Sequence, residues 1–433
     1  MPPKVGMVCV VTQHANTHSE GIGMVRTASI FSQILGFVDR AVFNRIVRRT
    51  AANRYTKKFT AWDHFVSMVF AQVAQAKSLR EVCDGLHCAV GKATHLGIQN
   101  LAKRSTLSYA NEHRPSTLFQ ELFADLARRL PASLPNRPQK PFRFKNKLMS
   151  LDSSVITLCL TLFPWAEYTR TKGGVKLHML LDHDGYFPSY AVITDAKRAD
   201  IQVARTLALP KGSIVAMDRG YVDYELFGRW TRDDGVYFVS RLKSNVPYHV
   251  IEQRPVPAGK PHVLRDEVIQ LTSDRGRKHC PYRLRRVVVW DAEHERELVL
   301  LTNHLDFAAD TISDIYRERW KIELFFKALK QNLKVKTFLG TSRNALEVQL
   351  WTALIAMLLV TFLRWLSKRG WSLSNLVALL RWNLFQYKDL VKWLDDPFET
   401  PPGLPDHPQL RLPGFDLGQL PKVDPEVVWP RLA

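Results

Sequence analysis

The chain is 433 residues long, enough to bury a sizeable core and to hold two or three structural units. Its 61 lysines and arginines outnumber its 41 aspartates and glutamates, so the formal net charge is +20 and a polyanion is the expected partner. The alternatives are a protein attracted to anionic lipid and a protein that is merely basic. The longest apolar run, residues 350–363, is shorter than the ~20 residues that span a bilayer, so we predict a buried helix there and no membrane partner.

The cysteines favour a reducing compartment. The five of them are odd in number and scattered, which fits a cytosolic protein better than a disulfide framework. Cys83, His87 and Cys88 resemble half of a zinc site, but no second ligand pair follows at zinc-finger spacing, and we do not predict zinc. Residues 1–23 carry no secretory signal and are expected to be disordered, as an upstream-extended start with Met24 as an alternative initiator.

Residues 24–130 have helical periodicity. Apolar residues recur at spacings of three and four from Ile30 to Val47, and Ser78 with Glu81 three residues later has the spacing of a capping box. Short helices next to basic turns are typical of DNA-binding modules, so we predict a helical DNA-binding domain, although any small helical bundle shows this pattern. The basic cluster comprises Arg48, Arg49, Arg54, Lys57 and Lys58, and further helices are expected at 62–74, from Ser78 and at 117–130.

The segment 131–147 has four prolines and five lysines or arginines, and we interpret it as a basic linker. Residues 148–345 then alternate strand and helix patterns. Asp152 lies in the middle of the first expected strand, and Asp218 directly follows the fourth. Because a lone buried carboxylate is costly, Asp152 requires a partner. The expected strands are 148–158, 174–181, 186–194, 213–217 and 236–240, with helices at 200–209 and 224–232.

The segment 316–330 concentrates charge on one side of a predicted helix. At about 100° per residue, Tyr316, Arg319, Glu323 and Lys330 fall on a stripe about 60° wide, beside an apolar arc that faces the core. Carboxylates bind Mg²⁺, and Arg and Lys bind phosphate oxygens, so the stripe suits phosphoryl transfer on a nucleic acid. A solvated face with an i,i+4 ion pair, worth a few tenths of a kcal/mol, is the alternative.

The spacing Tyr-x2-Arg-x3-Glu-x6-Lys resembles the signature of the insertion-sequence-four family of bacterial DDE transposases. The resemblance covers residues 148–340 and, more loosely, 24–130. It implies an α/β, RNase H-like mixed sheet in which the first and fourth strands lie side by side, so that Asp152 and Asp218 meet. It also implies a β-rich insertion at about 245–305 before the catalytic helix, with apolar-rich runs at 263–271, 284–289 and 298–302.

The resemblance further implies a site and a reaction. Asp152, Asp218 and Glu323 would hold two Mg²⁺ ions, with Mn²⁺ as a substitute, for phosphodiester hydrolysis and strand transfer. Tyr316, Arg319 and Lys330 would bind DNA phosphates. Trp290 would contact the DNA end, although packing on the inserted sheet is the favoured interpretation of that residue. The partners would be the terminal inverted repeats and target DNA, bound by a homodimer in the bacterial cytoplasm.

Two other functions fit the same residues. Another RNase H-like nuclease, such as a resolvase, would need the acids without the phosphate-binding Tyr-Arg-Lys set. A non-catalytic DNA-binding inhibitor of transposition would not need all three acids. Since Asp152, Asp218 and Glu323 are all present, we favour cut-and-paste transposition.

The remaining polar residues and the carboxyl terminus have simpler interpretations. Aspartates at turns and helix starts are expected to bond locally, and histidines are poor ligands for a hard ion, so we predict no metal role for Asp182, Asp184, Asp195, Asp223, His178 or His183. Residues 346–396 are expected to form helices, at 346–367 and 373–384. The proline-rich tail at 397–433 is expected to be non-globular, and we assign it no function.

Overall fold

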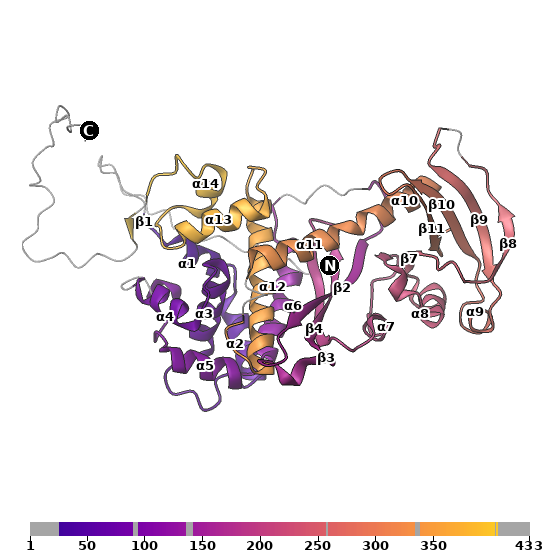
Figure 1. Ribbon diagram of the computed structural model, residues 1–433. Helices are drawn as coiled ribbons and strands as arrows, with labels where there is room; N and C mark the ends of the chain where they lie inside the picture. Colours follow the sequence, from indigo (N-terminus) through magenta and orange to yellow (C-terminus); the bar gives the residue numbers. More distant parts are fainter. Residues whose placement is uncertain are drawn as a thin grey trace, which may run out of the picture.

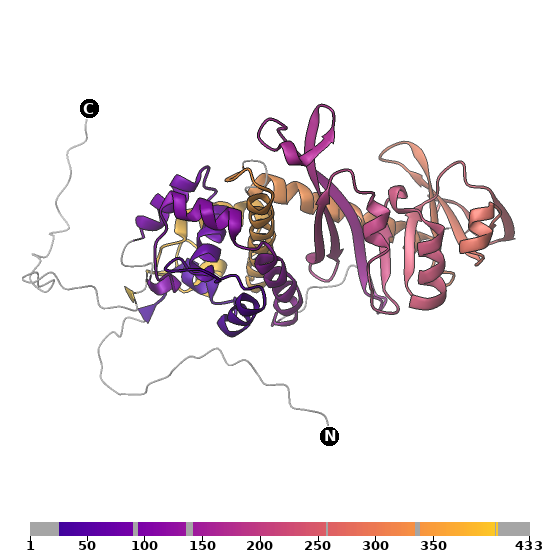
Figure 2. The same cartoon turned by 90° about the horizontal axis from the view of Figure 1, so that it is seen from below.

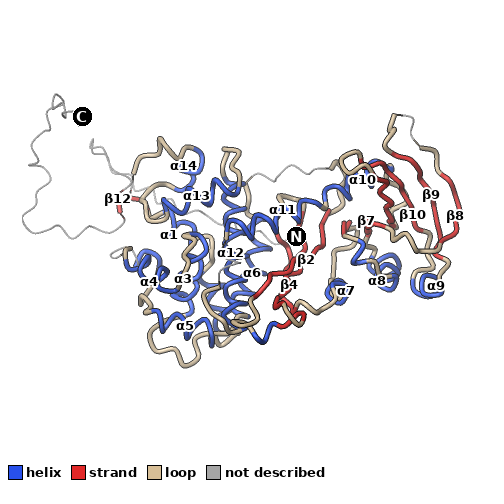
Figure 3. Tube along the Cα trace, viewed as in Figure 1, coloured by secondary structure: helices blue, strands red, loops and turns tan. Residues whose placement is uncertain are grey.

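A computed structural model describes residues 26–89, 94–135, 142–256, 259–333, 338–402 and 404–405. The chain forms two bodies that lie side by side, one made of helices and one built on a large sheet (Figures 1 and 2). Figure 3 shows the same division, with one side of the molecule almost entirely helical and the large sheet, with several helices around it, on the other. The predicted segment 1–23 and most of the predicted tail at 397–433, from residue 406 onward, lie outside the described residues.

The helical body combines the amino-terminal helices with helices from the end of the chain. Its buried residues form one hydrophobic cluster that also includes apolar residues from segments 156–158, 175–191 and 322–333 of the second body. The segments predicted as separate units at 24–130 and 346–396 therefore share a core. The helices are α1 (Ile30–Leu35), α2 (Arg40–Arg49), α3 (Ala61–Val73), α4 (Leu79–His87), α5 (Arg104–His113), α6 (Thr117–Ala132), α12 (Arg343–Leu366), α13 (Leu373–Asn383) and α14 (Leu390–Asp395).

α12 is the central helix of this body. It is 24 residues long and includes an 18-residue apolar window with a mean hydropathy of 1.9, so by length and composition it could cross a membrane. However, 94% of its apolar window is buried inside the protein, where α12 packs against α3, α5 and α6. The prediction of a buried helix is confirmed, although the helix extends well beyond the apolar run at 350–363.

Local signals explain several helix ends. The Ser78 hydroxyl accepts a hydrogen bond from the Glu81 N–H at 3.2 Å, so Ser78 caps α4 as predicted. The Glu81 carboxylate accepts from the Lys77 N–H and not from Ser78, which leaves the capping box half formed. α6 continues through Pro131, so the linker begins later than predicted; residues 136–141 of that linker lie outside the described part of the chain.

The second body is a ten-stranded mixed sheet. The strands run in the order β3-β4-β2-β6-β7-β11-β10-β9-β8, and β5 also pairs with β4. β2 matches its predicted bounds, and the strands of the inserted region continue the same sheet because β11 pairs with β7. The bounds are β2 (Leu148–Leu158), β3 (Glu167–Thr169), β4 (Lys172–Asp182), β5 (Phe187–Asp195), β6 (Ile214–Met217), β7 (Tyr237–Arg241), β8 (Tyr248–Gln253), β9 (Val263–Leu271), β10 (Leu284–Asp291) and β11 (Arg296–Thr302).

Helices cover both faces of this sheet. Met149 and Met217 belong to the cluster on the face packed by α7 (Asp200–Ala204) and α8 (Tyr224–Arg229), while Leu148 and Ala216 belong to the cluster that includes α10 (Ala309–Glu318). This alternation is the period-two pattern of a strand. α9 (Asp274–His279) packs on α8, and α11 (Trp320–Asn332) runs from the sheet toward the helical body (Figure 1).

Candidate active site

Two aspartates meet where the parallel strands β2 and β6 stop pairing. Leu151 of β2 lies beside Met217 of β6, so the following residues, Asp152 and Asp218, lie at the same end of the strand pair. Since side chains alternate along a strand, both aspartates fall on the face covered by α10. The strand order implied by the resemblance therefore holds for this pair.

The segment 316–330 is helical as predicted except at Arg319, so it forms two helices where one was predicted. α10 ends at Glu318, Arg319 lies in the turn, and α11 begins at Trp320. The Arg319 N–H donates to the Tyr316 carbonyl at 3.2 Å, a three-residue bond that tightens the turn. The apolar spacing continues across the break, so the sequence pattern alone could not show it.

The break brings the signature residues to the aspartates from two helices. From α10, the Tyr316 hydroxyl donates a long hydrogen bond, 3.4 Å, to the Asp218 carboxylate. In the turn, one terminal nitrogen of Arg319 lies 2.7 Å from Glu323 and another lies 3.5 Å from Asp152. One guanidinium thus contacts two of the three acids, and Tyr316 contacts the third.

This group is largely shielded from solvent. The side chain of Arg319 is only 12% exposed, that of Asp152 is 20% exposed, and that of Glu323 is 32% exposed. The Arg319–Glu323 pair does have the i,i+4 spacing of a surface ion pair. Its burial and its contact with Asp152 exclude the alternative of a simple solvated helix face.

Burial, more than the neighbouring charges, shifts the pKa of Asp152. Burial raises the pKa of the Asp152 carboxyl to about 6, and the charges of Glu323 and Asp218 add to this rise. The Ser153 N–H and the Arg319 guanidinium act in the opposite direction but do not cancel it. A carboxyl group with a shifted pKa that lies beside other acids, where two parallel strands stop pairing, is typical of a functional site.

Two further predicted site residues, Lys330 and Trp290, have other surroundings. Lys330 is held on β2, where its ammonium donates to the Ser154 hydroxyl at 2.7 Å and to the Val155 carbonyl at 3.1 Å. It therefore ties α11 to the strand that carries Asp152. Trp290 lies on β10 opposite Glu297, within the inserted part of the sheet, and is 44% exposed.

The site includes neighbours that sequence reasoning missed. Asp200 accepts a hydrogen bond from the Ser153 hydroxyl at 2.9 Å and lies 3.0 Å from the Lys176 ammonium. Burial, followed by the charges of Asp152 and Asp200, raises the pKa of the Tyr221 phenol. An aspartate at a helix start looks like an ordinary capping residue, and only the adjacent Ser153 could have suggested a role beside Asp152.

The other acids and histidines have local partners. Three of the four aspartates for which no metal role was predicted pair with basic side chains, and each histidine contacts a hydroxyl. The pairs are Asp182–Lys147 (2.8 Å), Asp223–Arg205 (2.7 Å), Asp195–Arg343 (3.2 Å), His178–Thr194 (2.9 Å) and His183–Ser150 (2.7 Å).

The donor set fits a hard divalent cation. Asp152, Asp218 and Glu323 offer carboxylate oxygens, the ligands that Mg²⁺ prefers, and burial disfavours the charged form of Asp152 while no cation is bound. Across the described ranges, no three His, Cys, Asp or Glu side chains are gathered closely enough to hold an ion as they stand. Arg319 instead contacts both Asp152 and Glu323, so metal binding requires this guanidinium to yield at least one of them.

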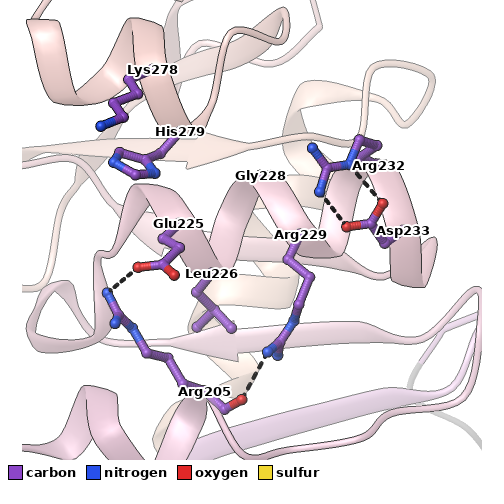
Figure 4. Close-up of a pocket in the computed structure, with 9 residues that line it drawn as sticks. All are labelled: Arg205, Glu225, Leu226, Gly228, Arg229, Arg232, Asp233, Lys278 and His279. Atoms are coloured by element: carbon purple, nitrogen blue, oxygen red, sulfur yellow. Dashed lines mark hydrogen bonds and ion pairs between the residues drawn. The ribbon is translucent and has the colours of Figure 1, made fainter.

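The hollow drawn in Figure 4 is a separate feature. It has a volume of about 410 Å³ and lies beside α8 and α9. Its guanidinium groups are already engaged: Arg205 pairs with Glu225 at 2.9 Å, and Arg232 pairs with Asp233 at 2.6 Å (Figure 4). This arrangement leaves little unpaired positive charge for an anionic ligand, so we do not treat it as a functional site.

Comparison with known proteins agrees with the geometry of the acids. A family model described as a transposase DDE domain matches residues 143–359, and a model described as a domain of unknown function matches residues 26–99. The chain belongs to the DDE transposase family. That domain implies an enzyme that cleaves DNA and transfers strands.

Relatives named as transposases cover most of the chain. The protein y4zB of Sinorhizobium fredii is 33% identical over 312 residues, which is 71% of this chain and 82% of that protein. A Geobacillus stearothermophilus protein, named as a probable transposase for insertion sequence element IS5377, is 32% identical over 60% of this chain and 67% of its own length. A cryo-EM structure of a piggyBac transposase synaptic complex with hairpin DNA covers 85% of this chain and 81% of that chain, at 11% identity and a TM-score of 0.37, which is too low to support an argument.

Proposed function

We propose that this protein is the transposase of a bacterial insertion sequence of the insertion-sequence-four family, with an RNase H-like catalytic domain. It binds the ends of its element in the cytoplasm and moves the element by metal-dependent cleavage and strand transfer. The observation that carries the proposal is the meeting of Asp152 and Asp218 on adjacent parallel strands, with Glu323 joined to Asp152 through Arg319. The match to a transposase DDE domain supports it.

Asp152, Asp218 and Glu323 are the residues that would hold the metal, as two Mg²⁺ ions for which Mn²⁺ can substitute. When bound, these ions supply an activated nucleophile and neutralise charge on the phosphate under attack. The residues of the chain orient this site. Tyr316 fixes Asp218 by its hydrogen bond, and Lys330 fixes α11 against β2.

Arg319 has a double role in this proposal. In the structure its guanidinium compensates Asp152 and Glu323, two acids that would otherwise repel each other. Its planar fork of donors also matches a phosphate group. We infer that DNA phosphate takes Arg319 from Glu323, which frees that carboxylate, while Tyr316 and Lys330 hold phosphates nearby. Trp290, half-exposed on β10, is the proposed contact with the DNA end.

The substrates in this proposal are duplex DNA, first as the terminal inverted repeats of the element and then as target. Two ends must be held together for productive transposition, so we propose a homodimer on DNA. Light scattering with and without end DNA tests this part. A monomer under both conditions contradicts it.

Cleavage of a labelled duplex with the terminal repeats that flank the reading frame tests the proposed activity. Wild type is expected to cut at the element end in Mg²⁺, and Glu323→Gln is expected to bind but not cut, because the amide keeps the shape of the side chain without its charge. Asp314→Asn is the matched control, because Asp314 lies on α10 in an exposed pair with Arg317, at 2.9 Å. If wild type and Glu323→Gln both bind and neither cuts in Mg²⁺ or Mn²⁺, a non-catalytic inhibitor of transposition replaces the proposal.

A further inference from the structure

The helical body contains a large cavity, away from the three acids. Its volume is about 870 Å³, in the range of sites that hold small molecules or single residues of a polymer. One wall is the segment 50–59, between α2 and α3, and the other is formed by residues 100–103 and α5, at the lower edge of the helical body in Figure 1. Two large rings are open to solvent here, Tyr55 at 87% and Tyr109 at 65% exposure.

The walls of the cavity are fixed in place. The buried guanidinium of Arg114 donates to the Ala52 carbonyl at 2.9 Å and to the Phe59 carbonyl at 2.7 Å, so one side chain holds both ends of the 50–59 segment. The Asn100 amide donates to the Lys58 carbonyl at 2.9 Å and joins the two walls. Between these bonded positions, Tyr55 has a φ of 59°, a conformation that is uncommon for a bulky residue.

The exposed rings are arranged as flat surfaces. Tyr109 and His113, one turn apart on α5, stack with centroids 4.0 Å apart and planes 17° apart. Across the cavity, the Arg54 guanidinium lies over the Tyr55 ring, 4.9 Å from its centroid. Single exposed rings are common, but two exposed rings that line one basic cavity indicate a contact site for another planar or apolar group.

The charge around the cavity is positive and uncompensated. Arg54, Lys57, Lys58 and Lys103 line it and are exposed, and none of its described lining residues is an aspartate or glutamate. Within the described part of the chain, none of these four cations forms an ion pair. The hollow of Figure 4 differs, because there Arg205 and Arg232 are paired with acids.

We propose that this cavity binds an unpaired nucleobase of DNA, stacked on Tyr109 and Tyr55, with the flanking phosphates on Arg54, Lys57, Lys58 and Lys103. Every base has a π face that can stack on an aromatic ring, and cations beside such rings hold the backbone. A base inside a duplex exposes only its edges and could not enter between the rings. The inference rests on the proposed function for its choice of DNA, and it gives a role to a region that overlaps the domain of unknown function.

Fluorescence anisotropy with a labelled 12-nucleotide oligothymidylate, in EDTA, tests the inference on the full-length protein. Tyr55→Ala and Tyr109→Ala are each expected to weaken binding about 5- to 100-fold, while Tyr109→Phe keeps the ring and binds like wild type. Circular dichroism checks that each variant is folded. Phe398→Ala is the matched control: Phe398 is 72% exposed, and Arg369 lies 5.8 Å from its centroid, but it lines no part of this cavity.

Three results would overturn the inference. The first is wild-type affinity for oligothymidylate in both tyrosine-to-alanine variants. The second is an equal loss on a 12-base-pair duplex, which would show that the rings do not recognise unpaired bases. The third is a clear preference for oligouridylate, which would make the partner RNA. The assay uses no metal and no cleavage, so its failure is distinguishable from failure of the cutting test with Glu323→Gln.

Discussion

The site of the three acids and the cavity of the helical body use positive charge in opposite ways. At the site of the three acids, the side chain of Arg319 is only 12% exposed and contacts two carboxylates. Around the cavity, Lys57, Lys58 and Lys103 are exposed and face no acid among the lining residues that the structure describes. A paired, buried cation positions other groups, whereas an unpaired, exposed cation attracts a polyanion. In the two proposals above, this contrast separates the residues that would cut DNA from the residues that would hold it.

Arg319→Ala is expected to have the largest effect on this contrast. The change removes the guanidinium that bridges Glu323 and Asp152 and leaves their charges in repulsion, so cleavage should fall about 10- to 100-fold, as for other groups that orient metal ligands. Single-turnover cleavage of end DNA measures the loss. Arg317→Ala is the control, because Arg317 is 72% exposed and pairs with Asp314 on the protein surface. Equal losses of cleavage in the two variants would show that the buried Arg319 has no larger role than an arginine on the surface.

Asp152→Asn is expected to stabilise the protein when metal is absent. With the pKa of Asp152 raised to about 6 from 3.8, its ionised form is disfavoured by folding, so the Asn variant should gain about 3 kcal/mol in free energy of unfolding at pH 7.5. The native state binds more protons than the unfolded state between these two pKa values. Wild type therefore loses stability as pH rises through this window, and the advantage of Asn should vanish near pH 3.5.

Urea unfolding in EDTA at pH 3.5, 5 and 7.5 measures this difference. Asp182→Asn serves as a comparison, since the Asp182 carboxylate is paired with Lys147 at 2.8 Å and should not gain stability when neutralised. An Asp152→Asn variant that is less stable than wild type at pH 7.5 would show that burial does not disfavour the ionised form of Asp152.

The smallest expected effect is on the salt dependence of DNA binding. Removing one phosphate-binding cation should lower the slope of log affinity against log salt by about 0.7 for single-stranded DNA, so Lys57→Ala and Lys58→Ala are each expected to flatten it by that amount. Anisotropy between 50 and 300 mM salt measures the slope. Lys392→Ala, on α14 at the other side of the helical body (Figure 1), should leave it unchanged. An identical slope in all three variants would remove the cavity from the DNA-binding surface.

Much of the sheet was predictable because its strands are bounded apolar runs. β2 and β9 have the bounds expected from the sequence, 148–158 and 263–271, and Asp152 and Asp218 were placed on adjacent strands by the resemblance. α5 was missed because only three of its ten residues are buried and no side chain caps its start. Periodicity cannot predict a helix without an apolar stripe.

The finer features of the two sites depend on contacts between distant residues. The break at Arg319 adjoins Glu318, which accepts a hydrogen bond from Tyr186 at 3.2 Å, more than 100 positions away in the chain. The cavity likewise requires Arg114 to hold the 50–59 segment through the Ala52 and Phe59 carbonyls. Neither contact has a signal in local spacing, so neither could be predicted from sequence pattern alone.

The central claim is that Asp152, Asp218 and Glu323 act as one unit in cutting DNA. Single-turnover cleavage of end DNA by Asp152→Asn, Glu323→Gln and the double variant tests it most directly. Groups that act as a unit are non-additive, so each single variant should lose about 10³-fold or more and the double variant should be no worse than either. Near wild-type cutting by either single variant, or losses that multiply in the double variant, would contradict the account.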